Sequence, residues 1–142
     1  MKPLLHAGEM DDLERWMETH LKKGAHHPFS FTYNDQPASS FLRNWQSDSE
    51  TKRLDDVRTK RTLTLKDPET GLKLSCESEV FADFPAVEWV IKLRNEGIED
   101  TPILKDVNSL DVQLTRKEGG EFVLHHALGS DASRMDFAPL NT

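Results

Sequence analysis

Two successive runs of strict apolar–polar alternation, between Leu72 and Leu93, constrain the fold of this chain more than any other feature. The apolar residues of each run share one face: Leu72, Leu74, Cys76 and Val80 in the first, and Val87, Trp89, Ile91 and Leu93 in the second. A period of two means extended strands with one buried face. This region is therefore predicted to form half-buried antiparallel sheet, a scaffold that supports functional sites more often than it constitutes one.

Length and composition favour one globular domain over residues 1–142, because 142 residues suffice for one hydrophobic core but not for two. Charged residues make up 30% of the chain and the mean hydropathy is -0.64. No apolar run is long enough to span a membrane, and Pro3–Leu5 is too short for the apolar region of a signal peptide. We expect a cytoplasmic protein with no membrane partner, unless a signal was removed.

The charge argues against a nucleic-acid-binding protein, and the cysteine content excludes a protein with an internal disulfide. The net charge is -7, and no basic stripe with interleaved aromatic residues is present, so nucleic acid is not an expected partner. Cys76 is the only cysteine, which rules out an intramolecular disulfide. Its place on the apolar face of a predicted strand indicates a small buried hydrophobic residue rather than a catalytic thiol.

The N-terminal region is predicted to be an amphipathic helix over 9–23. Its apolar residues recur at the spacing of one helix face: Met10, Leu13, Trp16, Met17 and Leu21. Acidic residues favour its N-terminal end, and Lys22–Gly24 makes a suitable stop. We expect the apolar face to clamp the helix onto the sheet or a neighbouring domain, with partner binding as the alternative.

The remaining elements are short strands and turns, predicted over 29–126. Strands are predicted at Phe29–Tyr33, Arg58–Lys66, Ile103–Leu114 with a break near Asn108–Ser109, and Glu121–His126; Ser39–Trp45 fits a helical turn, Gln46–Asp56 an exposed loop, Asp67–Gly71 a hairpin turn and 127–142 a long loop. Such connections are too short for parallel crossovers. The chain is therefore predicted to be mostly β: an antiparallel β-sandwich, whole or partial, with one N-terminal helix.

No catalytic or metal-binding motif stands out. Gly-x-Ser-x-Gly, phosphate-binding glycine loops and Cys-x-x-Cys are all absent. The adjacent histidines His26–His27 and His125–His126 cannot chelate a metal as pairs, since neighbouring residues of a strand point to opposite faces. Carboxylate pairs are too abundant for the sequence to select two at glycosidase spacing. No catalytic residue, metal or cofactor is predicted.

One segment has the composition of a ligand site. The loop after the last predicted strand combines histidines and charged residues that suit the hydroxyls of a carbohydrate, and Trp45 offers a ring for stacking. The candidate ligand-binding residues are Trp45, His125, His126, Asp131, Arg134 and Asp136. Loops at the ends of sandwiches are where sites are commonly built. An ordinary terminal loop is the alternative.

Several short sequence segments of the chain, called phrases below, resemble the N-terminal β-sandwich region of alpha-galactosidase-like glycoside hydrolases (the melibiase group, family 36 and its relatives). The phrases are Phe29–Tyr33, Pro37–Leu42 with Trp45, Leu54–Arg58, Asp67–Leu72, Asp83–Trp89, Asn95–Gly97, Thr101–Leu104, His125–Ser130 and Asp136–Leu140. The resemblance covers nearly the whole chain after the first helix. It concerns the scaffold, because none of these phrases is catalytic.

The resemblance implies a non-catalytic module. In such enzymes the two catalytic aspartates lie in a (β/α)8 barrel that follows the sandwich, and this chain contains no barrel. The module would support that barrel, in the same or a related chain, and lend Trp45 or the loop from His125 to Asp136 to sugar binding. The alternatives are a free-standing carbohydrate-binding module and an immunoglobulin-like assembly domain that forms a homodimer through an open sheet edge or the helix.

Overall fold

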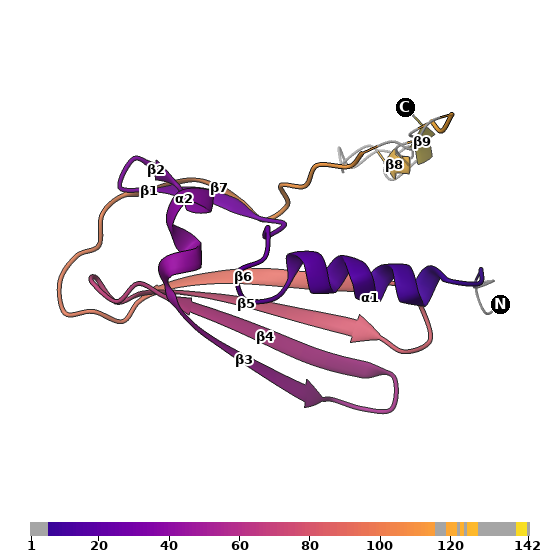
Figure 1. The fold of residues 1–142 in the computed structure, drawn as a ribbon, viewed down its shortest axis with the longest axis horizontal. Coiled ribbons are helices and arrows are strands. Elements are labelled where there is room, and N and C mark those ends of the chain that lie inside the picture. The colour runs from indigo at the N-terminus through magenta and orange to yellow at the C-terminus, as the bar shows by residue number, and fades with distance from the viewer. Residues whose placement is uncertain (1–5, 116–118, 122, 124, 128–138, 142) are drawn as a thin grey trace, which may run out of the picture. The chain divides into compact units, whose positions relative to one another are not determined.

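The computed structural model describes residues 6–115, 119–121, 123, 125–127 and 139–141. The chain divides into two compact units, Met1–Val112 and Gln113–Thr142. The first unit contains α1 (Glu9–His20), β1 (Ser30–Tyr33), β2 (Gln36–Pro37), α2 (Ala38–Phe41), the 3-10 helix η1 (Leu42–Asn44), β3 (Gln46–Arg53), β4 (Arg58–Lys66), β5 (Leu72–Phe81), β6 (Val87–Asn95) and β7 (Leu104–Asn108) (Figure 1). The second contains β8 (His125–Ala127) paired with β9 (Pro139–Asn141).

The predicted mostly-β, antiparallel fold is confirmed. The first unit has a three-stranded sheet of order β2-β1-β7 and a four-stranded sheet of order β3-β4-β5-β6, consistent with a β-sandwich. Both sheets and the α2–η1 segment contribute to one core: Phe29, Phe31, Tyr33, Ala38, Leu42, Trp45, Leu63, Leu65, Leu72, Leu74 and Cys76. The core therefore lies on one face of the four-stranded sheet, which we call its inner face.

The alternation that predicted β5 and β6 is visible directly in the burial of the side chains. In β5, Leu72, Leu74 and Cys76 are buried, whereas the residues between them are only partly so. The β4–β5 and β5–β6 pairings run without a register shift, so Leu65, Leu74 and Leu93 stand side by side on the inner face. One cross-strand row thus fills the core from three strands at once.

Two turns explain the shape of the hairpins. Between β4 and β5, Asp67 accepts hydrogen bonds from the hydroxyl of Thr70 (2.7 Å) and the amide of Glu69 (3.0 Å), which closes the turn. Between β1 and β2, Asn34 and Asp35 both have positive φ angles, 49° and 57°. Two such residues make a type I′ turn, whose twist matches that of the flanking strands.

The predicted phase shift after Ile103 corresponds to a bulge in β7. Thr32 pairs with Lys105, but Ser30 pairs with Asn108, so β7 carries one more residue than β1 across this interval. Asp106 within it has a φ of 52°. The irregularity lies inside β7, and the strand ends at Asn108, where the break was expected. The predicted continuation of the strand to Leu114 is wrong, because residues 109–114 form no strand.

Four predicted boundaries differ from the structure. The segment Gln46–Asp56, expected to be a loop, contains the eight-residue strand β3. Its pattern alternates hydroxyl and charged side chains, and it therefore lacks the apolar signal of a strand. The helix ends at His20 rather than Lys23. The last predicted strand begins at His125, not Glu121, and Pro139–Asn141 in the predicted tail loop forms β9. Residues 128–138 of that loop lie outside the described residues.

Helix α1 is clamped onto the inner face of the four-stranded sheet, as its apolar stripe predicted (Figure 1). Met17 is 1% exposed. Trp16 packs against Trp89 of β6 with ring centroids 5.7 Å apart. Arg61 of β4 donates to the carboxylate of Glu14 at 3.1 and 3.2 Å. An aromatic contact, a buried methionine and an ion pair therefore join α1 to the sheet.

Candidate functional site

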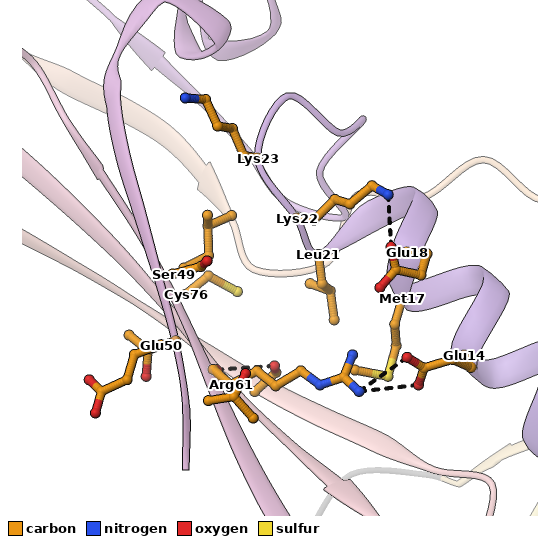
Figure 2. A pocket seen from close by; sticks show the side chains of 14 residues that line it. Glu14, Met17, Glu18, Leu21, Lys22, Lys23, Ser49, Glu50, Arg61 and Cys76 are labelled. Atoms are coloured by element: carbon orange, nitrogen blue, oxygen red, sulfur yellow. Dashed lines mark hydrogen bonds and ion pairs between the residues drawn. The ribbon is translucent and has the colours of Figure 1, made fainter.

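A recess of about 400 Å³ lies between α1 and strands β3, β4 and β5. Met17 of α1 and Leu21, which directly follows the helix, line one side, and Cys76 of β5 lies opposite them (Figure 2). Leu63 of β4 also lines the recess. The inner-face residues of β3 that line it, Ser49 and Thr51, are small and polar.

Charged side chains line this recess, and four of them form two ion pairs, Arg61–Glu14 and Lys22–Glu18. Figure 2 shows Arg61 extending from the sheet toward Glu14, and Lys22 folded back onto Glu18. The hydrogen bond from Lys22 and its positive charge hold the pKa of Glu18 below its usual range. An ionised carboxylate of this kind is a poor general acid at neutral pH. The rim therefore offers charge and hydrogen bonding rather than proton transfer.

The floor of the recess offers no nucleophile. Burial raises the pKa of the Cys76 thiol to about 12, so the thiolate required for reaction is not available near neutral pH. This agrees with the expectation that Cys76 is a small buried hydrophobic residue, since it is free and 1% exposed. Ser78 donates its hydroxyl to the backbone oxygen of Arg61 at 3.2 Å and has no basic side chain as a partner. Cys76 and Ser78 are therefore both engaged in contacts within the fold.

A second, smaller recess of about 200 Å³ lies on the opposite, outer face of the sheet. Glu77 stands at its centre and accepts hydrogen bonds from Lys60 (2.5 Å) and Lys92 (2.6 Å). These two lysines hold the pKa of Glu77 below its usual range. The carboxylates of Glu79 and Glu88, on directly opposed positions of β5 and β6, complete the lining. This surface therefore carries two ion pairs that share the half-buried Glu77.

Trp45, a candidate for stacking on a carbohydrate, is placed in the core. Its ring is 7% exposed, lies 5.9 Å from Tyr33 in a perpendicular arrangement, and is 5.3 Å from Phe41. Neighbouring aromatic rings therefore occupy the surroundings that a sugar would need. The observed role of Trp45 is to join the α2–η1 segment to β1.

The other candidate ligand residues fall in the second unit. His125 and His126 lie in β8, opposite Asn141 and Leu140 of β9. Asp131, Arg134 and Asp136 lie outside the described residues. The prediction that this loop binds a ligand therefore stays a prediction.

The recess beside α1 was not predicted from the sequence. Its β3 side comes from a segment that the sequence pattern had assigned to a loop. A signal was present nonetheless: Ser47, Ser49 and Thr51 alternate with charged residues over the whole of β3, and a period of two is typical of a strand whatever its polarity.

Among the described residues, no group of three or more histidine, cysteine, aspartate or glutamate side chains is arranged to hold a metal ion. Within the same residues, no helix has both the length and the apolar character that crossing a membrane requires. No family model, curated protein or solved structure matches this chain.

Proposed function

We propose that this chain is a non-catalytic β-sandwich module of a glycoside hydrolase-like protein, and that it supports a (β/α)8 catalytic barrel. Two observations support the proposal: the places in the fold of the phrases that resemble alpha-galactosidase-like enzymes, and an exposed apolar surface at one edge of the sandwich.

Several of the phrases that carry the resemblance include packing positions. The Phe29–Tyr33 phrase and Trp45 lie together in the core. The phrases Asp67–Leu72 and Asn95–Gly97 meet where Glu96 donates its backbone N–H to Gly71 at 3.1 Å. Residues that specify packing and turns are what a shared scaffold would retain. The resemblance is therefore to a scaffold rather than to a site, in keeping with a supporting role.

The observation that carries the proposal is the apolar surface around β7. This strand is the outer member of its sheet, with β1 on one side and no paired strand on the other within the described residues. Ile103, Val107 and Leu110 are 78%, 47% and 62% exposed. Apolar side chains gathered beside an open strand edge are typical of a surface that another domain covers.

A free-standing carbohydrate-binding module has less support. Such modules need an exposed aromatic ring for stacking. Trp45 is buried, and Trp16 and Trp89 pack against each other. Trp45 is thus buried and the other two tryptophans are half-buried against each other, which leaves the loop from His125 to Asp136 as the part of the chain predicted to contact sugar.

The catalytic half of the proposal is tested by activity. The purified chain is expected to show no hydrolysis of aryl alpha-galactosides. Hydrolysis that disappears when an acidic residue of this chain is replaced would contradict the proposal.

The supporting role is tested at the apolar surface. Sequencing the genomic reading frame past Thr142 should give a barrel with paired aspartates.

In that longer protein, Leu110→Asp should lower the melting temperature, because a charge is placed in a domain contact. In the isolated chain the same change should alter the free energy of unfolding by no more than about 0.5 kcal/mol. The control is Val57→Asp, at another exposed apolar residue, in the β3–β4 turn (42% exposed), and it should be neutral in both proteins. Equal effects of the two variants would refute a contact at β7.

A further inference from the structure

Strand β3 is a long, regular and uncovered edge. It is the outermost strand of the four-stranded sheet, and seven of its eight residues are exposed. Its pairing with β4 runs from Gln46 to Arg53 without a register shift, so no bulge interrupts it. Proteins usually protect such an edge with a bulge, a proline or a very short strand. β3 has none of these. Charged side chains are the other common protection, and β3 carries four that are exposed: Asp48, Glu50, Lys52 and Arg53.

A hydrogen bond just after β3 shows which of its residues bond to β4 and which face the free edge. Leu54 donates its backbone N–H to the carbonyl of Arg58 at 2.9 Å, and these two residues continue the β3–β4 register. In an antiparallel pair, hydrogen-bonded positions alternate with non-bonded ones. Even-numbered residues of β3 therefore bond to β4. Ser49, Thr51 and Arg53 direct their N–H and C=O groups outward, to the free edge.

The side chains of β3 add a charge pattern to this edge. Glu50 and Lys52 lie on the outer face and are exposed. Neither forms an ion pair within the part of the chain that the structure describes. They flank Thr51, one on each side, and have opposite charges.

We propose that two copies of this chain associate through β3, antiparallel and edge to edge, about a two-fold axis that passes through Thr51. In this register Thr51 faces Thr51 of the second copy, Ser49 faces Arg53, and Glu50 faces Lys52 on both sides of the axis. The outward-pointing odd-numbered residues then exchange about six backbone hydrogen bonds. Glu50 and Lys52 occupy the non-bonded positions, where opposed side chains are closest.

Other symmetric registers are disfavoured by like charges. Directly opposed residues must lie on the same face of the joined sheet, so the axis passes through a residue. An axis at Ser49 places Asp48 opposite Glu50. An axis at Glu50 or at Lys52 places that residue opposite its own copy. The Thr51 register is the one among these four that has two opposite-charge pairs and no like-charge pair.

The association would join the two four-stranded sheets into one continuous sheet. It would also place the second copy beside the recess between α1 and β3, on the side where Ser49 and Thr51 line it. The partner is thus recognised by backbone pairing and by charge order along one strand. This assembly is independent of the proposed contact at β7, which lies in the other sheet.

The test is sedimentation velocity of the full chain from about 1 μM to about 1 mM, with charge-reversal variants. The wild type should show a reversible monomer–dimer equilibrium. Glu50→Lys and Lys52→Glu each replace two attractive pairs with two repulsive ones, so each should raise the dimer dissociation constant at least about tenfold. The double variant Glu50→Lys/Lys52→Glu restores both pairs and should dimerise like the wild type.

Mixing the two single variants gives the sharpest result. One copy then carries lysine at positions 50 and 52 and the other carries glutamate at both, so every opposed pair is attractive. The mixture should form a heterodimer although neither variant dimerises alone. Far-UV circular dichroism should show that all variants fold, since both side chains are exposed. A wild type that stays monomeric up to about 1 mM, single variants that dimerise like the wild type, or a mixture that stays monomeric would each overturn the proposal.

Discussion

The inner face of the four-stranded sheet has two halves that differ in how they are covered. In the core half, Leu65, Leu72 and Leu74 are at most 2% exposed beneath the aromatic residues of β1 and the α2–η1 segment. In the α1 half, the row across the sheet is Thr51, Arg61, Ser78 and Trp89, and α1 leaves a recess beside it. One sheet thus carries a tightly packed apolar region and a loosely covered polar one.

The difference indicates that the core half supplies most of the stability and that the α1 half opens more easily. Burial of apolar area is the dominant favourable term in folding, and the core half supplies most of it. α1 is attached through few contacts, of which the Arg61–Glu14 pair is largely exposed and worth little. Elements held in this way open locally at lower free energy than the core does. The predictions below test this division, beginning in the core half.

The largest expected effect is that of Trp45→Ala. Removing a ring packed against Tyr33 and Phe41 should destabilise the fold by about 3–5 kcal/mol, through lost burial and the cavity left behind. Urea unfolding followed by far-UV circular dichroism measures this, and Trp45→Phe, which keeps an aromatic ring, should cost much less. A loss below about 1 kcal/mol for the alanine variant would mean that the core half is not the main source of stability.

The second effect, also in the core half, is that of Gly97→Ala. A Cβ on Gly97 would overlap the carbonyl oxygen of Thr70, and one on Gly71 would lie 2.8 Å from the backbone nitrogen of Gly97. The β4–β5 turn and the end of β6 therefore pack backbone to backbone. The expected cost is about 2–3 kcal/mol, as for other overpacked sites.

The matched control for Gly97 lies just after α1. Gly24 has a positive φ of 72°, but its Cβ would meet nothing within 4 Å. Gly24→Ala should therefore cost only the backbone strain of the left-handed conformation, about 1 kcal/mol. Thermal unfolding of both variants measures the two losses of stability. An equal cost at the two positions would show that the Gly71–Gly97 contact is not tight.

The elements of these two halves could be predicted from the sequence where their residues form an apolar pattern, and not where the pattern is polar. Apolar alternation correctly predicted β5 and β6, and the apolar stripe correctly predicted α1 and its contact with the sheet. The pattern of β3 was misassigned because hydroxyl groups replace apolar ones on its inner face. The recess then escaped prediction, since it depends on the β3–β4 register and on the position of α1, which are set by long-range packing. Trp45 was expected at a ligand site because a single ring in a sequence does not reveal whether it is buried.

In the α1 half, Trp89→Ala should act locally. It removes the contact with Trp16 and the hydrogen bond from the indole nitrogen to the backbone oxygen of Ser109 (2.8 Å). We expect a loss of about 2 kcal/mol in α1 protection from hydrogen exchange, with a smaller change in β4 and β5. Val90→Ala, at the next residue of β6 but on the outer face, should be within about 0.5 kcal/mol of the wild type. Equal loss of protection in α1 and in β4 would contradict the division into two halves.

The smallest effect concerns pH and the loop that joins α1 to β1. His27 is half-buried, stacks on Phe29 with ring centroids 5.0 Å apart, and contacts the backbone oxygen of His20 at 3.3 Å. Burial lowers the pKa of His27 below its ordinary value of 6.5, and the charges of His26 and His20 act in the same direction, while the hydrogen bond to His20 opposes them.

The sign of the pH dependence follows from this lowered pKa. As the pH falls through about 6.5, the unfolded chain binds a proton on His27 before the folded chain does. The stability contributed by neutral His27 is therefore complete above this pH and declines below it. Between pH 7 and pH 5 the free energy of unfolding of the wild type should fall more steeply than that of His27→Gln. His26→Gln, an exposed neighbour, should retain the wild-type slope. If His27→Gln keeps that slope as well, the loop between α1 and β1 does not exclude water from His27, and the lower stability of the α1 half has another origin.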